Sequence, residues 1–207
     1  AMWVHQIKTP ISALRLLLQE KDELDSSSEE LGELFLIEQY VEMALQYVRL
    51  ESESSDFVIE QVKLDEVIRG AIRKYARMFI RKKISLDYEE TDLTVLTDKK
   101  WLSFVTEQIL SNAVKYTAKG EIKVSVRKEG ETELFLTISD TGIGIKAEDL
   151  PRICENGYTG YNGHANGQST GIGLYLCSRM LKKLGHSLTI TSKEGEGTTV
   201  CIGFQME

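Results

Sequence analysis

The stretch Asp140-Thr141-Gly142-Ile143-Gly144-Ile145 marks the point where a regular pattern ends and a long loop begins. Before it, residues 134–139 carry the aliphatic, aromatic and β-branched side chains typical of a buried strand. After it, from residue 140 to 170, glycines and polar residues replace the aliphatic pattern. A loop of this length in a compact domain is usually functional or mobile. The sequence around residue 140 is therefore the first place to expect a ligand site.

The first glycine turn has the residue types that could receive a purine base. Asp140 closes the strand, and its carboxylate could accept a hydrogen bond from an adenine amino group. Gly142 and Gly144 would let the backbone approach the base without an intervening side chain. The alternative is an ordinary Asp-Thr-Gly turn with no ligand.

A second glycine turn, Ser169-Thr170-Gly171-Ile172-Gly173-Leu174, stands where the loop passes into a helix expected at residues 172–184. Gly171 and Gly173 leave backbone N–H groups uncovered at a helix start, where the positive end of the helix dipole favours phosphate. The alternative is a plain helix start with Thr170 as its N-cap.

The helix expected at residues 101–116 carries a polar side chain among apolar neighbours. Asn112 lies in mid-helix, where an amide is costly to bury unless it binds something. Lys115 and Tyr116 follow three and four residues later on the same helix face and could contact phosphate. These three residues form a second candidate group for the same ligand.

Working outward, residues 57–207 alternate between short strand patterns and amphipathic helix patterns. The fold class is α+β, and the simplest arrangement is one mostly antiparallel sheet covered on one face by three helices. Strands are expected at residues 57–63, 84–88, 93–96, 122–127, 134–139, 187–192 and 198–204, and helices at residues 64–81, 101–116 and 172–184.

The first 53 residues have a different pattern. Two helices, expected at residues 3–24 and 29–53, are joined by a short polar turn and carry apolar residues at alternating spacings of three and four. Such an antiparallel hairpin cannot bury its apolar stripe alone, so pairing with a second copy into a four-helix bundle is expected. The alternative is that the stripe packs on the rest of the chain. The polar residues 54–56 form the linker between domains 1–53 and 57–207.

The composition of the chain argues against several classes of protein. The 207 residues are 42% hydrophobic and 28% charged, with a net charge of -7, which argues against nucleic-acid binding. No run approaches the roughly 18 apolar residues that a membrane span needs. Cys154, Cys177 and Cys201 are odd in number and widely spaced, so they support neither a disulfide framework nor a zinc site.

His5, in Trp3-Val4-His5-Gln6-Ile7-Lys8-Thr9-Pro10, would alone be taken for a solvated surface histidine. Its position before the Asn112 helix and the two glycine turns resembles the catalytic core of the sensor histidine kinases. In that family a dimerisation hairpin precedes an ATP-binding domain of the type shared with gyrase and Hsp90. The resemblance covers essentially the whole chain, and the order of the four motifs is far more specific than any one of them.

The resemblance implies ATP and Mg²⁺ as cofactors and assigns roles by matching position. Asp140, with Gly142 and Gly144, would bind adenine, and Thr170, Gly171, Gly173 and Leu174 would form the second glycine motif. Asn112 would coordinate Mg²⁺, and Lys115 and Tyr116 would contact phosphate. Gln108, one turn before Asn112, stands where many relatives carry another asparagine and could offer a second oxygen to the metal.

At the acceptor, the resemblance makes His5 the residue that is phosphorylated and Thr9 the residue that positions water for removing phosphate from the partner protein. Gln6 departs from the family pattern, which has an acidic residue there. An amide can accept a hydrogen bond from the imidazole but cannot take a proton, so its help is weaker.

The loop between the glycine turns resembles the family's mobile ATP lid. Cys154 stands where a phenylalanine is usual and Asn156 where a basic residue is common, which leaves Arg152 and His164 as substitutes for a charge contact to the γ-phosphate.

The wording His-Gln-Ile-Lys-Thr-Pro-Ile-Ser is similar to membrane-linked kinases of Gram-positive bacteria that respond to antimicrobial peptides such as bacitracin. This implies a homodimer, a cognate response regulator, and the cytoplasmic domain of a cell-membrane protein whose sensor segment lies outside this sequence and could be coupled to a transporter. The alternatives are a gyrase- or Hsp90-like ATPase or chaperone module, and a degenerate nucleotide-binding dimerisation module.

Overall fold

The computed structural model describes residues 11–12, 14–16, 18, 29–51, 57–159 and 170–205. The chain divides into two compact units, Ala1–Ser55 and Asp56–Glu207. His5, Gln6, Thr9, the expected linker at residues 54–56 and His164 lie outside the described residues, as does most of the helix expected at residues 3–24. The predictions that depend on them stay predictions.

The first unit contains one long described helix, α2, at Glu29–Glu51. The described residues 14–16 are also helical, and the ion pair between Arg15 and Glu38 joins them to α2. The helical hairpin is therefore partly evident. Along the apolar stripe of α2, Leu34 is buried, whereas Ile37 and Val48 are 49% and 54% exposed in the single chain. Part of the stripe thus remains accessible.

The second unit is built on a mixed five-stranded sheet in the order β2-β4-β5-β7-β6. All neighbouring strands are antiparallel except β2 and β4, which pair in parallel. The strands are β2 at Ile84–Tyr88, β4 at Gly120–Glu129, β5 at Glu133–Asp140, β6 at Ser187–Lys193 and β7 at Gly197–Gln205.

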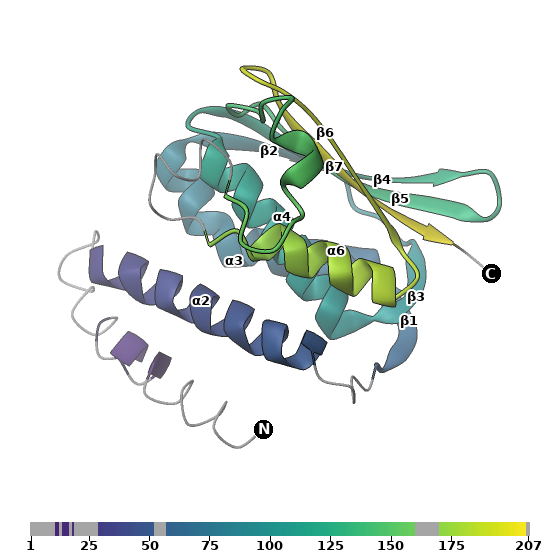
Figure 1. The fold of residues 1–207 in the computed structure, drawn as a ribbon, viewed down its shortest axis with the longest axis horizontal. Helices are drawn as coiled ribbons and strands as arrows, with labels where there is room; N and C mark the ends of the chain where they lie inside the picture. The colour runs from purple at the N-terminus through teal and green to yellow at the C-terminus, as the bar shows by residue number, and fades with distance from the viewer. Residues whose placement is uncertain are drawn as a thin grey trace. The chain divides into compact units, whose positions relative to one another are not determined.

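Three helices cover one face of this sheet, as the sequence predicted (Figure 1). They are α3 at Leu64–Lys82, α4 at Lys99–Tyr116 and α6 at Gly173–Lys183. Helix α4 packs against both α3 and α6 and also against β5. Because neighbours surround it, apolar side chains on several of its faces, such as Phe104, Val105 and Val114, are buried.

The prediction of a single sheet was wrong for two strands. β1 (Ile59–Lys63) and β3 (Thr94–Asp98) pair only with each other in a separate antiparallel ribbon. Each runs directly into a helix, β1 into α3 at Leu64 and β3 into α4 at Lys99. The ribbon therefore lies at the ends of these helices instead of extending the main sheet (Figure 1). Its Val62 and Val95 are buried.

Asp98 joins this ribbon to α4. Its Oδ1 accepts a hydrogen bond from the backbone N–H of Trp101 at 2.9 Å and so caps the helix. Its Oδ2 accepts one from the backbone N–H of Val58 at 3.0 Å, just before β1. One buried carboxylate thus satisfies two backbone donors, and the Phe57 ring packs edge-on against that of Trp101.

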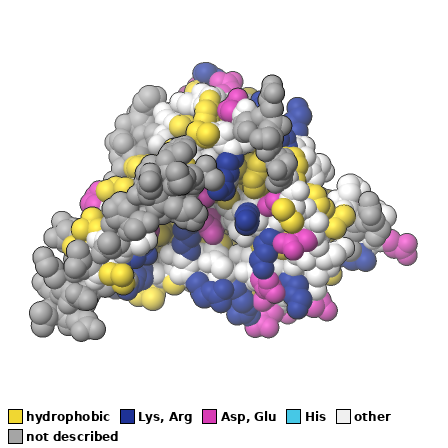
Figure 2. All heavy atoms as spheres, turned by 90° about the horizontal axis from the view of Figure 1, so that it is seen from below, with side chains coloured by type: hydrophobic (Ala, Val, Ile, Leu, Met, Phe, Trp, Pro, Cys, Tyr) yellow, Lys and Arg dark blue, Asp and Glu magenta, His cyan; other side chains and the backbone are white. Residues whose placement is uncertain are grey.

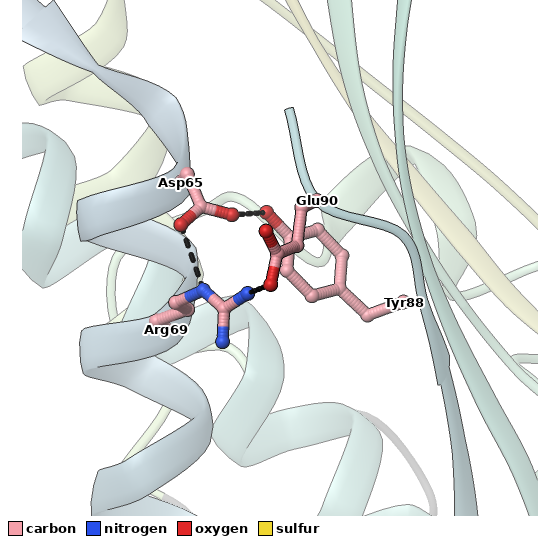
Figure 3. Close-up of polar contacts among 4 residues, drawn as sticks. All are labelled: Asp65, Arg69, Tyr88 and Glu90. Carbon is pink, nitrogen blue, oxygen red and sulfur yellow. Dashed lines mark hydrogen bonds and ion pairs between the residues drawn. The ribbon is translucent and has the colours of Figure 1, made fainter. Parts of the chain in front are cut away.

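A polar network fastens the start of α3 to the end of β2 (Figure 3). The Asp65 carboxylate accepts hydrogen bonds from the Tyr88 hydroxyl at 2.6 Å and from Arg69 Nε at 2.7 Å. Arg69 also pairs with Glu90. The hydrogen bond from Tyr88 is the largest cause of the lowered pKa of Asp65. The carboxylate therefore stays ionised and keeps both contacts.

Charged side chains of both signs share the surface. Further ion pairs join Lys74 to Glu107 and Lys99 to Glu66. On the face drawn in Figure 2, Lys and Arg side chains lie next to Asp and Glu side chains. Among the described residues, no helix has the length and apolar character to cross a membrane.

Candidate functional site

Asp140 ends β5 with its carboxylate half-buried. Its Oδ1 accepts a hydrogen bond from the backbone N–H of Gly142 at 2.8 Å, which shapes the first glycine turn. Burial raises the pKa of the Asp140 carboxyl group, while the N–H groups of Gly142 and Thr198 oppose that rise. A ligand that donates a hydrogen bond to this carboxylate would further favour its ionised form.

The first glycine turn is packed closely against other parts of the protein. A Cβ on Gly142 would lie 2.5 Å from the carbonyl oxygen of Tyr116, and one on Gly144 would lie 2.0 Å from that of Lys193. Backbone hydrogen bonds hold both contacts, from Ile143 N to Tyr116 O at 3.2 Å and from Gly195 N to Ile143 O at 2.7 Å. The sequence analysis attributed Gly142 and Gly144 to the close approach of a ligand. The close approach of the protein's own backbone is already enough to require glycine at both positions.

Helix α4 ends on this turn and carries the Asn112 group. Asn112 is half-buried, and within the described part of the chain its amide has no hydrogen-bond partner. Gln108, one turn earlier, is only 9% exposed. Lys115 Nζ lies 5.3 Å from the centroid of the Tyr116 ring, and burial lowers the pKa of the Lys115 ammonium group. The end of α4 thus offers amide oxygens and a cation beside the Asp140 turn.

The second glycine turn closes the base of the long loop. The backbone N–H of Gly157 donates to the carbonyl oxygen of Gly171 at 3.0 Å. Gly171 has a φ of 67°, and a Cβ there would lie 2.4 Å from the carbonyl carbon of Gly157. Any side chain at residue 171 would strain the backbone and would also push apart the two loop segments that contain Gly157 and Gly171.

The start of α6 follows this turn. The helix begins at Gly173, and its N-cap, Ile172, makes no side-chain capping bond. The Thr170 hydroxyl instead accepts a hydrogen bond from Ile172 N at 3.3 Å. The alternative reading of Thr170 as the N-cap was therefore wrong. The bond from Leu176 N to Ile172 O is the first of the helix, so the N–H groups of Gly173 and Leu174 are not used within it.

The described first part of the loop is tied together by side chains. The Tyr158 hydroxyl donates to the buried Asp149 carboxylate, and the Arg152 guanidinium carbon lies 4.3 Å from the centroid of the Tyr158 ring. Arg152 also pairs with Glu155 at 3.1 Å. Arg152, the predicted substitute for a γ-phosphate contact, is thus engaged within the loop. Cys154 is half-buried, and burial raises the pKa of its thiol.

Sequence reasoning missed a row of hydroxyl groups behind Asp140. Thr198 lies opposite Asp140 in the pairing of β5 with β7, and opposite Ser192 in the pairing of β7 with β6. The hydroxyls of Ser192 and Thr198 are 2.9 Å apart, and Ser192 Oγ accepts a hydrogen bond from Ile145 N at 2.8 Å. The strand alternation around Thr198 was visible in the sequence, but the register that sets it beside Asp140 was not.

Sensor kinases are among the proteins that this chain resembles in sequence. Two relatives are the sensor histidine kinase YxdK of Bacillus subtilis, 38% identical over 98% of this chain and 62% of its own length, and the sensor protein BceS of Halalkalibacterium halodurans, 35% identical over 99% and 61%. The chain thus spans about three-fifths of the length of these relatives.

Solved structures share the fold. Full-length ShkA in complex with AMPPNP superposes with a TM-score of 0.71 at 17% identity, covering 100% of this chain and 46% of that chain. The Acinetobacter baumannii histidine kinase AdeS superposes with a TM-score of 0.66 at 20% identity, covering 98% of each chain. The family profile described as "Histidine kinase-, DNA gyrase B-, and HSP90-like ATPase" matches residues 97–207, more than half of the sequence. The chain therefore belongs to the histidine kinase-, DNA gyrase B- and HSP90-like ATPase family.

Proposed function

We propose that this chain is the catalytic core of a sensor histidine kinase, which transfers the γ-phosphoryl group of Mg-ATP to His5 and then to an aspartate of a response regulator. The observation that carries the proposal is the joining of the Asp140 turn to the end of α4 by the bond from Ile143 N to Tyr116 O. On this proposal, the bond lies between the turn of Asp140, which would accept from the base, and the α4 residues that would contact phosphate and metal.

The residues divide between the two ends of the nucleotide. Asp140 accepts a hydrogen bond from the adenine amino group, with Gly142 and Gly144 shaping the turn. Lys115 and Tyr116 contact phosphate from α4. On the other side of the loop, Thr170, Gly171, Gly173 and Leu174 present backbone N–H groups to phosphate at the start of α6.

Asn112 and Gln108 fit a magnesium ion held largely by the nucleotide. The two amides lie four residues apart, on one helix face, and offer neutral oxygens. Among the described residues, no group of three or more His, Cys, Asp or Glu side chains could hold a metal ion. A site with so few protein charges suits Mg²⁺ that arrives with the phosphates and keeps water ligands. When bound, the ion neutralises phosphate charge during transfer.

At the acceptor, an imidazole nitrogen lone pair of His5 attacks the γ-phosphorus. The bond to the β–γ bridging oxygen breaks, and ADP leaves with that electron pair. Gln6 can orient the imidazole through a hydrogen bond but takes no proton. In the second reaction the P–N bond breaks as the regulator's carboxylate attacks, and Thr9 positions water when the regulator is dephosphorylated.

The proposal includes a homodimer formed through the hairpin of residues 1–53. Ile37 and Val48 are exposed on α2 in the single chain, and a second copy would cover them in a four-helix bundle. The proposal further includes a cytoplasmic location at the cell membrane, a cognate regulator and a sensor function, the last in line with relatives that are named as sensor proteins. Coupling to a transporter belongs to the same proposal.

The test is incubation with ATP labelled at the γ-phosphate. The wild-type protein should acquire acid-labile label, and the His5→Ala variant should acquire none while still binding nucleotide. Asn112→Ala should remove Mg-dependent labelling and leave the melting temperature near that of wild type. Label that persists in His5→Ala would refute the acceptor. Steady phosphate release that does not depend on His5 would instead point to a gyrase- or Hsp90-like ATPase. Nucleotide binding without any transfer would indicate a degenerate module.

A further inference from the structure

The carbonyl groups of residues 113–117, which are the last four residues of α4 and its C-cap, are all hydrogen-bonded, although a helix end normally leaves several without partners. Thr117 N donates to Ala113 O at 3.1 Å, and Ile143 N donates to Tyr116 O at 3.2 Å. The other three carbonyls accept from a single group, the ammonium of Lys82. Its Nζ lies 2.6 Å from Val114 O, 3.0 Å from Lys115 O and 3.1 Å from Thr117 O.

Lys82 reaches these carbonyls because it is the last residue of α3, which packs along α4. An ammonium has three N–H donors, so the three carbonyls match it fully. Lys83 follows in a left-handed conformation, and its N–H bonds back to Ile80 O, which ends α3 at that point. The Lys82 side chain is half-buried, so its charge is little screened by solvent.

The same helix end carries the candidate nucleotide residues. Asn112 and Lys115 lie in its last two turns, and the Asp140 turn is fastened to Tyr116 O. A helix C-terminus also bears a negative partial charge, which disfavours bound phosphate. A cation on its carbonyls both holds the last turn in shape and offsets that charge.

We infer that Lys82 is a positioning residue for the nucleotide site, acting through the end of α4 and not by touching the nucleotide. This inference rests on the proposed function. The base-binding turn and the phosphate-binding helix face keep their spacing because Lys82 completes the helix end between them. Substituting Lys82 should therefore weaken nucleotide binding more than it slows the transfer step.

The experiment compares three variants of the whole chain. Lys82→Gln keeps a hydrogen-bond donor but removes the charge, and Lys82→Arg keeps the charge. Lys83→Gln is the matched control, since Lys83 is adjacent and exposed and its side chain forms no hydrogen bond or ion pair with any of the described residues. For each, the KM for ATP and kcat of autophosphorylation are measured, together with the Kd for Mg-AMPPNP by calorimetry and the melting temperature.

Lys82→Gln should raise the KM for ATP and the Kd for Mg-AMPPNP by about tenfold, which is the effect expected for the loss of one charge-assisted hydrogen-bonded group. The kcat should stay within about threefold of the wild-type value. Lys82→Arg should recover most of the affinity, and Lys83→Gln should match wild type. A purely structural role would lower the folded fraction, and so kcat, while leaving KM and Kd of the folded molecules unchanged. That result would overturn the inference.

If Lys82→Gln melts near the assay temperature, the affinities of all the proteins are measured at 10 °C. Lys82→Arg, which keeps the charge, is then compared with the wild type at that same temperature. The two proposals fail in different ways. A wild-type protein that binds Mg-AMPPNP but labels no histidine would refute the kinase and leave the Kd comparison to decide on Lys82. A wild-type Kd for Lys82→Gln in an active kinase would refute only the role of Lys82.

Discussion

The backbone N–H of Gly157 donates to the carbonyl oxygen of Gly171 at 3.0 Å, across a segment that contains the undescribed residues 160–169. The contact holds the two ends of that segment together next to the start of α6. The position of the second glycine turn, which we propose binds phosphate, therefore depends on the part of the loop that precedes it.

The first prediction concerns this contact. Gly171→Ala should weaken Mg-AMPPNP binding by about tenfold or more, because its Cβ would meet the Gly157 backbone at 2.4 Å and its φ of 67° disfavours a side chain. The matched control is Gly130→Ala, which has a φ of 63° but no atom within 4 Å of its Cβ. That control should cost about 1 kcal/mol of unfolding free energy and leave binding unchanged. Equal losses of binding in the two variants would mean that backbone strain alone is responsible.

The second prediction concerns Asp140. Asp140→Asn should reduce affinity for Mg-ADP by about thirtyfold or more, since an amide accepts a hydrogen bond less strongly than a carboxylate. Calorimetric titration of both proteins at pH 7 measures this. Affinity of the wild type should also fall in acid, starting at a higher pH than an ordinary aspartate would give, because burial raises the pKa of this carboxyl group.

The same substitution should stabilise the protein without nucleotide. A raised pKa means that the folded protein holds this proton more tightly than the unfolded chain, so ionisation at neutral pH lowers stability. Asp140→Asn removes that cost. A lower melting temperature of the nucleotide-free variant at pH 7 would contradict this account.

The third prediction concerns His186, whose Nε2 lies 2.8 Å from the buried Thr97 Oγ1 and whose ring packs edge-on against Phe204. Burial lowers the pKa of His186, so the unfolded chain takes up a proton at a higher pH than the folded protein. Stability should be full above about pH 6.5 and fall as pH drops below it, by at most about 1.4 kcal/mol per pH unit from this group.

Urea unfolding at several pH values between 7 and 5 measures the slope. The His186→Gln variant keeps a hydrogen-bonding side chain but does not titrate, so its stability should depend less on pH over this range. Identical slopes in the two proteins would assign the pH dependence to other groups.

The fourth prediction concerns Asp98, the carboxylate between Trp101 N and Val58 N. Asp98→Ala should lower the free energy of unfolding by about 2 kcal/mol, because it removes a helix cap and leaves a second backbone donor without its partner. Asp98→Asn should cost less, since its oxygen can still cap the helix. Asp87→Ala, which removes an exposed ion pair with Lys123, should change stability little. All three are compared by urea unfolding.

Much of the second unit was predictable from local patterns. The expected limits of the strand at 84–88 match β2, and the limits expected for α4 and α6 lie within two residues of those observed. The periodicity of apolar residues within a segment predicts the type of element, and the glycines at its ends predict where it stops.

What failed depended on contacts between distant segments. The sequence of residues 57–63 or 93–96 does not indicate that the two strands pair only with each other, because the pattern of a single strand does not identify its pairing partner. In the sequence, Lys82 is an ordinary basic residue at the end of a helix. In the structure, its ammonium group donates to carbonyl oxygens that lie 32 to 35 residues away along the chain. The close packing of Gly144 on Lys193 was hidden for the same reason.

The contacts of the Asp140 turn with the β6–β7 hairpin also bear on how the site comes into being during synthesis. A Cβ on Gly197 would lie 1.9 Å from the carbonyl oxygen of Asp140, and β7 inserts between β5 and β6. The turn is therefore completed by a strand that leaves the ribosome after every other strand of the sheet. On the proposed function, a nascent chain that has emerged only as far as α6 carries every α4, β5 and α6 residue proposed to contact nucleotide but lacks the strand that packs against the Asp140 turn. We therefore expect it to bind ATP only after the β6–β7 hairpin has formed.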